Sequence, residues 1–100
     1  MNLLQSYSQD IFDLCSKHKV KTLYAFGSVL TDHFNDKSDV DLLVDFYPLE
    51  MSDYADNYFG LKFSLEDTLR RRVDLLEDKA IKNPYFIKSL HEQRRLIYGQ

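Results

Sequence analysis

The sequence predicts a single α+β domain, and the evidence is an alternation of helical and strand patterns along its 100 residues. Segments with apolar residues at helical spacing are separated by short runs of β-branched, aromatic and apolar residues. The length fits one domain over residues 1–100. A chain of this size buries roughly 60–70% of its unfolded surface, so one core can form without disulfide or metal support.

The first half of the chain predicts a helix, a strand, a short helix and a second strand. Apolar residues on one helical face predict a helix over residues 3–18. Residues 22–26 predict a strand that ends at Gly27, and Ser28 is expected to open a short helix over 28–34. Residues 35–38 are turn formers, and residues 40–46 predict a second strand that Pro48 stops.

The second half predicts a long helix, a third strand and a last helix. Ser52 is a candidate cap for a helix over 53–70, and residues 73–76 predict a strand. Asn83-Pro84 suits the start of a last helix that runs to about Gln93, and residues 95–98 can add a final short strand. The apolar stripe of the long helix is Tyr54, Tyr58, Leu61, Leu65 and Leu69.

Composition excludes several classes of protein. There are 13 basic and 16 acidic residues, so the net charge of −3 argues against direct nucleic-acid binding. The sequence shows no signal-peptide pattern and no apolar run approaching 18 residues, so we expect no membrane span. Cys15 is the only cysteine, which excludes an intrachain disulfide and favours a reducing cytoplasm.

Three aspartates stand out because they occupy strand-like positions where a carboxylate is costly to bury. Asp39 and Asp41 flank Val40, and Asp74 lies in "RVDLL". Strand side chains alternate between faces, so Asp39 and Asp41 point to the same side with Cα atoms roughly 6–7 Å apart. Mg²⁺ would relieve their repulsion, and three carboxylates can hold the two metal ions of phosphoryl or nucleotidyl transfer. The alternative is that these aspartates are solvated turn residues.

The Gly27-Ser28 pair is a candidate phosphate-binding turn. A helix that opens at Ser28 would offer unpaired N–H groups, and Gly27 would let a phosphate approach the backbone. The Ser28 hydroxyl can add one donor. The alternative is a plain strand-to-helix turn with a serine cap.

Gly27-Ser28, ten intervening residues and then Asp39-Val-Asp41 together resemble the signature of nucleotidyltransferases of the DNA polymerase beta type. The segments "LYAFGS", "SDVDLLVDF", "LEDTLRRRVDLL" and "RRLIYG" are similar, in order, to the minimal nucleotidyltransferase (MNT) family. The resemblance covers roughly residues 20–99.

The resemblance implies a small mixed β-sheet flanked by helices, with the active site at the edge of the sheet. It implies that an acceptor attacks the α-phosphorus of ATP or another nucleoside triphosphate and that Mg²⁺ is the cofactor. Asp39, Asp41 and Asp74 match the family's metal-binding and catalytic carboxylates, and Gly27 and Ser28 match its triphosphate-binding turn. It also implies a HEPN-domain toxin as partner, with this chain as antitoxin that places AMP on a tyrosine of the toxin.

The chain departs from the family pattern after Gly27-Ser28. Leu30, Thr31 and Asp32 stand where many members have a small residue, an arginine and a glycine, which leaves the triphosphate with fewer cationic contacts. Arg70, Arg71 and Arg72 precede the third strand, and the sequence does not assign them roles. A non-catalytic antitoxin that masks its partner is therefore the rival hypothesis. A free-standing enzyme that modifies a small molecule is disfavoured, because so short a chain has little left to enclose one.

Phe59 and Phe63 widen the apolar arc of the long helix beyond what one core face needs. Either the helix is wedged deeply in the core, or the two rings form a partner-binding face in a homo- or hetero-oligomer. The sequence leaves both alternatives open.

Overall fold

The computed structural model describes residues 2–99, and its elements follow the predicted order. The strands are β1 (Val20–Phe26), β2 (Val40–Phe46), β3 (Val73–Glu77) and β4 (Arg95–Tyr98). The α-helices are α1 (Asn2–Ser6), α2 (Ser8–Lys17), α3 (Met51–Leu69) and α4 (Pro84–Gln93). Two 3₁₀ turns, η1 (Gly27–Leu30) and η2 (Asp78–Ala80), follow β1 and β3.

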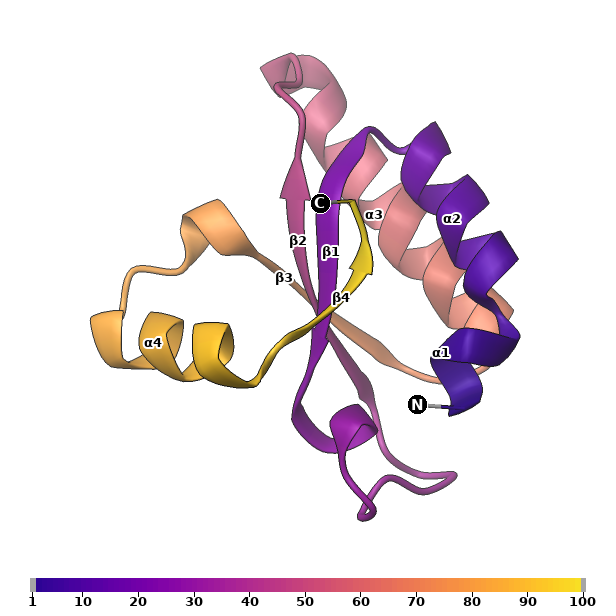
Figure 1. Cartoon of the computed structure of the whole chain (residues 1–100). Helices are drawn as coiled ribbons and strands as arrows, with labels where there is room; N and C mark the ends of the chain where they lie inside the picture. The colour runs from indigo at the N-terminus through magenta and orange to yellow at the C-terminus, as the bar shows by residue number, and fades with distance from the viewer. Residues whose placement is uncertain (1, 100) are drawn as a thin grey trace.

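The strands form one mixed sheet in the order β3-β2-β1-β4. β1 pairs antiparallel with β2 and with β4, whereas β2 and β3 run parallel. Helices α1, α2 and α3 lie on one side of the sheet and α4 lies on the other (Figure 1). The α+β class and the small mixed sheet flanked by helices are therefore confirmed. The end of β1, where the chain enters η1, and the beginning of β2 share one edge of the sheet (Figure 1).

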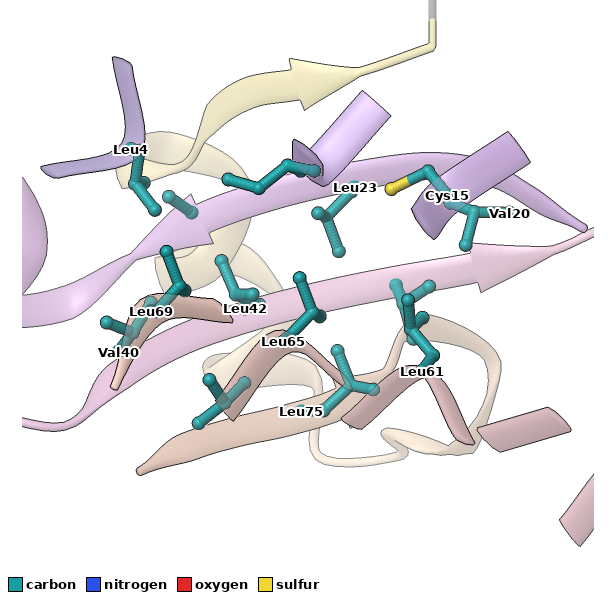
Figure 2. Close-up of a cluster of buried hydrophobic side chains, with 14 of the residues drawn as sticks. Leu4, Cys15, Val20, Leu23, Val40, Leu42, Leu61, Leu65, Leu69 and Leu75 are labelled. Carbon is teal, nitrogen blue, oxygen red and sulfur yellow. The ribbon is translucent and has the colours of Figure 1, made fainter. Parts of the chain in front are cut away.

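The core lies between the sheet and helices α1 to α3. Every third or fourth residue of α3 faces the strands, and Leu61, Leu65 and Leu69 are buried there as the apolar stripe predicts. Figure 2 shows these side chains against Leu42 of β2 and Leu75 of β3. Burial of so many branched side chains against two neighbouring strands fixes the register of the sheet, because a one-residue slip would turn them to the other face.

The helix predicted over 3–18 is interrupted at Tyr7, which has φ −109° and ψ 19°. Serines flank Tyr7 on both sides, and serine competes with helical bonding by offering local hydrogen bonds. The cap predicted at Ser52 is wrong, since the N-cap is Glu50. Asn83 does cap α4, because its side-chain oxygen accepts from the backbone N–H groups of Tyr85 (2.9 Å) and Phe86 (3.3 Å).

The short helix predicted over 28–34 is also wrong, because only the four residues of η1 are helical. Thr31 ends the turn: its hydroxyl and its backbone N–H both donate to the carbonyl oxygen of Ser28, at 2.9 Å each. The Thr31 hydroxyl oxygen also accepts from the N–H of His33 at 3.2 Å. A side chain that captures the first carbonyl in this way offers the backbone an alternative to the helix.

Between residues 2 and 99, no helix combines the length and the apolar character needed to cross a membrane.

Candidate active site

Asp41 and Asp74 are direct neighbours in the sheet. They are register partners in the parallel β2–β3 pair, so their side chains leave the sheet on the same face. On its other side Asp41 is opposite Phe26, the last residue of β1. Asp41 thus lies at one end of the sheet, on the strand between β3, which carries Asp74, and β1, which leads into Gly27.

Asp39 precedes β2 and is exposed, as is Asp74, whereas Asp41 is half-buried. Burial, and then the carboxylates of Asp74 and Asp39, raise the pKa of Asp41 above its ordinary value. Two of these three causes are like charges, so the structure brings the three predicted carboxylates within electrostatic reach of one another. Asp39 and Asp74 also line the same pocket.

These residues fit Mg²⁺ by their chemistry, because every donor is a carboxylate oxygen and the central one is destabilised by its neighbours. Within residues 2–99, no three carboxylate, histidine or cysteine side chains converge closely enough to enclose one ion. A closed cage is not what Mg²⁺ requires, since it usually takes one or two carboxylates together with substrate phosphates and water. The arrangement therefore suits an ion that arrives with a nucleotide.

Gly27 lies against Asp41 and adopts the left-handed conformation, with φ +74°. A Cβ atom at this position would overlap the Oδ2 atom of Asp41. Glycine is therefore required both by the backbone conformation and by the closeness of the carboxylate. The carboxylate of Asp41 occupies the space that a Cβ atom at position 27 would need.

Ser28 lies in a turn that is less suited to bind phosphate than the helix start that the sequence predicts. Because η1 is only four residues long, it adds little helix dipole, and the expectation of a helix N-terminus at Ser28 is not met. The Ser28 hydroxyl has no hydrogen-bond partner among the residues that the structure describes, so it can donate to a ligand. What remains of the predicted phosphate-binding turn is Gly27, this hydroxyl and the backbone N–H groups of η1.

Two cations that the sequence analysis did not assign lie beside the carboxylates. A pocket of about 340 Å³ contains Lys62 of α3 and Arg72 of the α3–β3 connection, with Asp39 and Asp74. The other lining residues are Glu66 and Val73, and the Glu66 carboxylate accepts from the Val73 N–H at 3.0 Å. Within residues 2–99, neither Lys62 nor Arg72 forms an ion pair. Lys62 could not be found from the sequence, because nothing along the chain relates it to the aspartates.

Two tyrosines fasten α3 to the strand that carries Asp74. The Tyr58 hydroxyl donates to the Leu75 carbonyl oxygen, and the Tyr54 hydroxyl donates to the Glu77 carboxylate. Burial, followed by the charges of Asp74 and Glu77, raises the pKa of Tyr58. Both tyrosines therefore stay protonated at neutral pH and serve as donors that hold β3 in place.

A mixed sheet with paired carboxylates at its edge, next to a glycine turn, defines a nucleotidyltransferase-type domain. Residues 11–97 match the family model described as "Nucleotidyltransferase domain", and the chain belongs to this family. The family resemblance stated from the sequence is thereby confirmed.

Relatives with curated names support the same assignment. A candidate protein adenylyltransferase of Methanocaldococcus jannaschii, MJ0128, is 46% identical over 85 residues, which are 85% of this chain and 82% of that protein. A second protein of that organism with the same description, MJ0126, is 37% identical over 87 residues, covering 86% of this chain and 83% of the relative.

Solved structures share the fold. A candidate minimal nucleotidyltransferase superposes with a TM-score of 0.77 at 26% identity, over 92% of this chain and 90% of the other. A toxin–antitoxin structure with AMP-PNP gives a TM-score of 0.72 at 21% identity, over 93% of this chain and 73% of that one. A complex of a tri-AMPylated HEPN toxin with MNT antitoxin from Shewanella oneidensis gives 0.67 at 21% identity, over 96% and 72%.

Proposed function

We propose that this protein is a Mg²⁺-dependent adenylyltransferase that transfers AMP from ATP to a hydroxyl of a HEPN-type toxin, and that it acts as the antitoxin. A tyrosine is the acceptor that we favour. The observation that carries the proposal is that Asp41 pairs in register with Asp74 and that Asp39 lines the same pocket as Asp74. A binding protein gains nothing from this arrangement, because crowded carboxylates destabilise a fold unless a cation is bound.

Each residue has a defined task in this reaction. Asp39, Asp41 and Asp74 would hold Mg²⁺, which when bound neutralises phosphate charge and acidifies an acceptor hydroxyl. Gly27 and Ser28 bind the β- and γ-phosphates through backbone N–H groups and the free serine hydroxyl. These contacts orient the nucleotide so that the bond to be broken faces the acceptor.

The transfer forms one bond and breaks another. The acceptor oxygen forms a bond to the α-phosphorus, and the α-phosphorus loses its bond to the oxygen that bridges to the β-phosphate. Pyrophosphate leaves with that electron pair. Asp74, which is exposed, accepts the proton of the acceptor hydroxyl.

The comparisons support this proposal without testing the individual residues. The curated relatives are named as candidate protein adenylyltransferases. In one structure of the same fold, a HEPN toxin that carries AMP groups is bound to its MNT antitoxin. Asp39, Arg72 and Asp74 are exposed in the pocket that they line, which is consistent with an acceptor that a protein partner presents from outside.

Mass spectrometry of the HEPN-domain partner after incubation with ATP and Mg²⁺ tests the proposal. We expect the partner to gain the mass of one or more AMP units. Asp39→Ala, Asp41→Ala and Asp74→Ala should each abolish the gain while the complex with the partner still forms. Omission of Mg²⁺ should have the same effect as the substitutions.

The alternative is an antitoxin that neutralises its partner by masking it. The departure from the family pattern at Leu30, Thr31 and Asp32, which removes a cation near the triphosphate, favours this alternative. It predicts that the partner is silenced with no change in mass and that Asp41→Ala silences it as well as the wild type does.

A further inference from the structure

The three consecutive arginines before β3 have different environments. Arg70 is the C-cap of α3 and adopts the left-handed conformation, with φ 56°. Arg72 is exposed and lines the pocket of Asp39 and Asp74. Arg71 is half-buried and reaches away from its own segment, toward the loop that follows η1. The side chain of the middle arginine thus joins two parts of the chain that are distant in sequence.

Arg71 makes three contacts with that loop. Its Nη1 atom donates to the carbonyl oxygens of Asn35 at 2.9 Å and Ser38 at 3.1 Å. Its guanidinium carbon lies 4.6 Å from the ring centroid of Phe34, and Phe34 packs against the hydrophobic core. The Nε atom of Arg71 is buried without a hydrogen-bond partner among residues 2–99, so the side chain is fully enclosed at this point.

The loop is ordered so that its carbonyl groups can meet Arg71. The Ser38 N–H donates to the Asn35 carbonyl oxygen at 3.0 Å, and the Asn35 N–H donates to the Ser38 hydroxyl at 3.1 Å. The Asn35 side-chain oxygen accepts from the Lys37 N–H at 2.8 Å. The turn over 35–38 therefore closes on itself, and Arg71 adds its bonds to the Asn35 and Ser38 carbonyls.

The contact of Arg71 with the loop affects the carboxylates, because the loop leads to Asp39 and the segment of Arg71 leads to Asp74. Asp41 and Asp74 are held by the register of β2 and β3, but Asp39 lies outside the strands and directly follows Ser38. Arg71 lies three residues before Asp74. The guanidinium therefore bridges the backbone next to Asp39 and the segment that leads to Asp74.

We propose that Arg71 is a positioning residue that sets Asp39 relative to Asp41 and Asp74 and thereby determines the affinity for a divalent cation. The inference rests on the proposed function, because it assumes that the three carboxylates share a cation. In this role Arg71 acts through the backbone of Asn35 and Ser38 and the ring of Phe34. Lysine cannot replace it, because an ammonium group is a compact point charge that lacks the planar fork and the face that stacks on Phe34.

The test measures Mn²⁺ binding by electron paramagnetic resonance in the presence of a non-hydrolysable ATP analogue, and hydrogen exchange of the loop by mass spectrometry without nucleotide. Arg71→Lys and Arg71→Ala should weaken Mn²⁺ binding roughly tenfold or more, as supporting residues around metal sites commonly do. Exchange should become faster over residues 35–39. Arg70→Gly is the matched control, because it removes the same charge one residue away and suits the left-handed backbone.

The outcomes separate this role from a merely structural one. Ile11→Ala, a core substitution in α2 and outside the pocket of the carboxylates, supplies a destabilised reference. If Arg71→Lys lowers the melting temperature as this reference does but binds Mn²⁺ like the wild type, the inference is overturned. It is also overturned if exchange over 35–39 is unchanged. If the wild type binds no Mn²⁺ together with the ATP analogue, the proposed function fails and the inference fails with it. If the wild type binds Mn²⁺ and Arg71→Lys binds it equally well, only the inference fails.

Discussion

Gly27 and Asp41 touch across the end of the β1–β2 pair, so closely that a Cβ atom on Gly27 would overlap the carboxylate of Asp41. The ideal Cβ position also lies 3.3 Å from the Asp41 Cγ atom. Together with φ +74° at Gly27, this contact ties the conformation of the turn to the placement of the central carboxylate. Two separate physical reasons, the left-handed backbone and the contact with Asp41, therefore require glycine at position 27.

Gly27→Ala should destabilise the fold and displace Asp41. The left-handed backbone alone costs an L-residue about 1–2 kcal/mol, and the overlap with Asp41 adds to this. We expect a loss of at least that size in the free energy of unfolding from urea denaturation, and loss of Mg²⁺-ATP binding by calorimetry.

A double-mutant cycle separates the two causes. In an Asp41→Ala background the carboxylate is absent, so Gly27→Ala should cost only the backbone strain. If the cost of Gly27→Ala is the same in both backgrounds, the overlap with Asp41 plays no part.

Asp41→Asn should raise the melting temperature of the protein without ligand. The substitution removes a half-buried charge that Asp74 and Asp39 repel. Burial first, and then these two carboxylates, raise the pKa of Asp41. The same change should abolish stabilisation by Mg²⁺-ATP, which for the wild type reaches about 2.7 kcal/mol when the ligand is at a hundred times its Kd. Thermal melts with and without Mg²⁺-ATP measure both effects.

Asp56→Asn is the control for this experiment, because Asp56 is exposed on α3 and outside the pocket of the carboxylates. It should leave both melts close to those of the wild type. Equal shifts by Mg²⁺-ATP in the wild type and in Asp41→Asn would contradict a cation site at Asp41.

The buried thiol of Cys15 makes a prediction about pH. Burial raises the pKa of Cys15 to about 12, whereas an unfolded cysteine titrates near about 8.5. The folded state therefore holds its proton more tightly, and the stability present below about pH 8.5 is lost as the pH rises toward 12. At pH 8 a thiol-specific disulfide reagent should react at once in urea but only at the rate of unfolding in buffer.

Cys15→Ala separates the thiol from other alkaline effects. Tyr54 and Tyr58 also have raised pKa values, so some loss of stability above pH 10 should remain in this variant. Between pH 9 and 10 its free energy of unfolding should fall less steeply than that of the wild type. Rapid, complete labelling of the native protein at pH 8 would show that Cys15 is not enclosed.

Local patterns in the sequence account for the strands and point to Asp39, Asp41 and Asp74. Residues 40–46 form β2 as predicted, because an apolar run stands between turn formers. The repeated Asp-Leu-Leu of Asp41 and Asp74 lies in register because buried leucines fix both strands. These features depend on alternation along a strand, which a sequence displays directly.

Such patterns do not predict contacts between residues that are distant in sequence. Arg71 meets the carbonyl of Asn35, 36 residues earlier, and only the folded loop brings them together. The helix predicted over 28–34 does not form, because the Thr31 hydroxyl donates a hydrogen bond to the carbonyl oxygen of Ser28. Helix propensities do not predict this local competition for the backbone. Periodicity showed that Phe59 and Phe63 share a face, but it could not show whether anything covers that face.

The structure settles one side of that question, since Phe59 and Phe63 are 47% and 58% exposed. Their rings stack on each other, with centroids 5.7 Å apart, and are not enclosed in the core. The core alternative for this pair is therefore wrong, and a role in partner binding stays a prediction. Replacing both residues with serine should change the free energy of unfolding by about 1 kcal/mol or less for each, because little buried contact is lost.

Leu65→Ala is the matched control on the same helix. Leu65 is fully buried, so its truncation should cost about 2–5 kcal/mol. Denaturation curves compare the variants, and calorimetry with the HEPN-domain partner then measures binding. We expect the Phe59→Ser, Phe63→Ser double variant to fold like the wild type but to bind the partner more weakly, because two exposed aromatic rings would leave the interface. Unfolding of the double variant would contradict the small loss of stability expected for two exposed rings, and unchanged affinity would place the partner on another face.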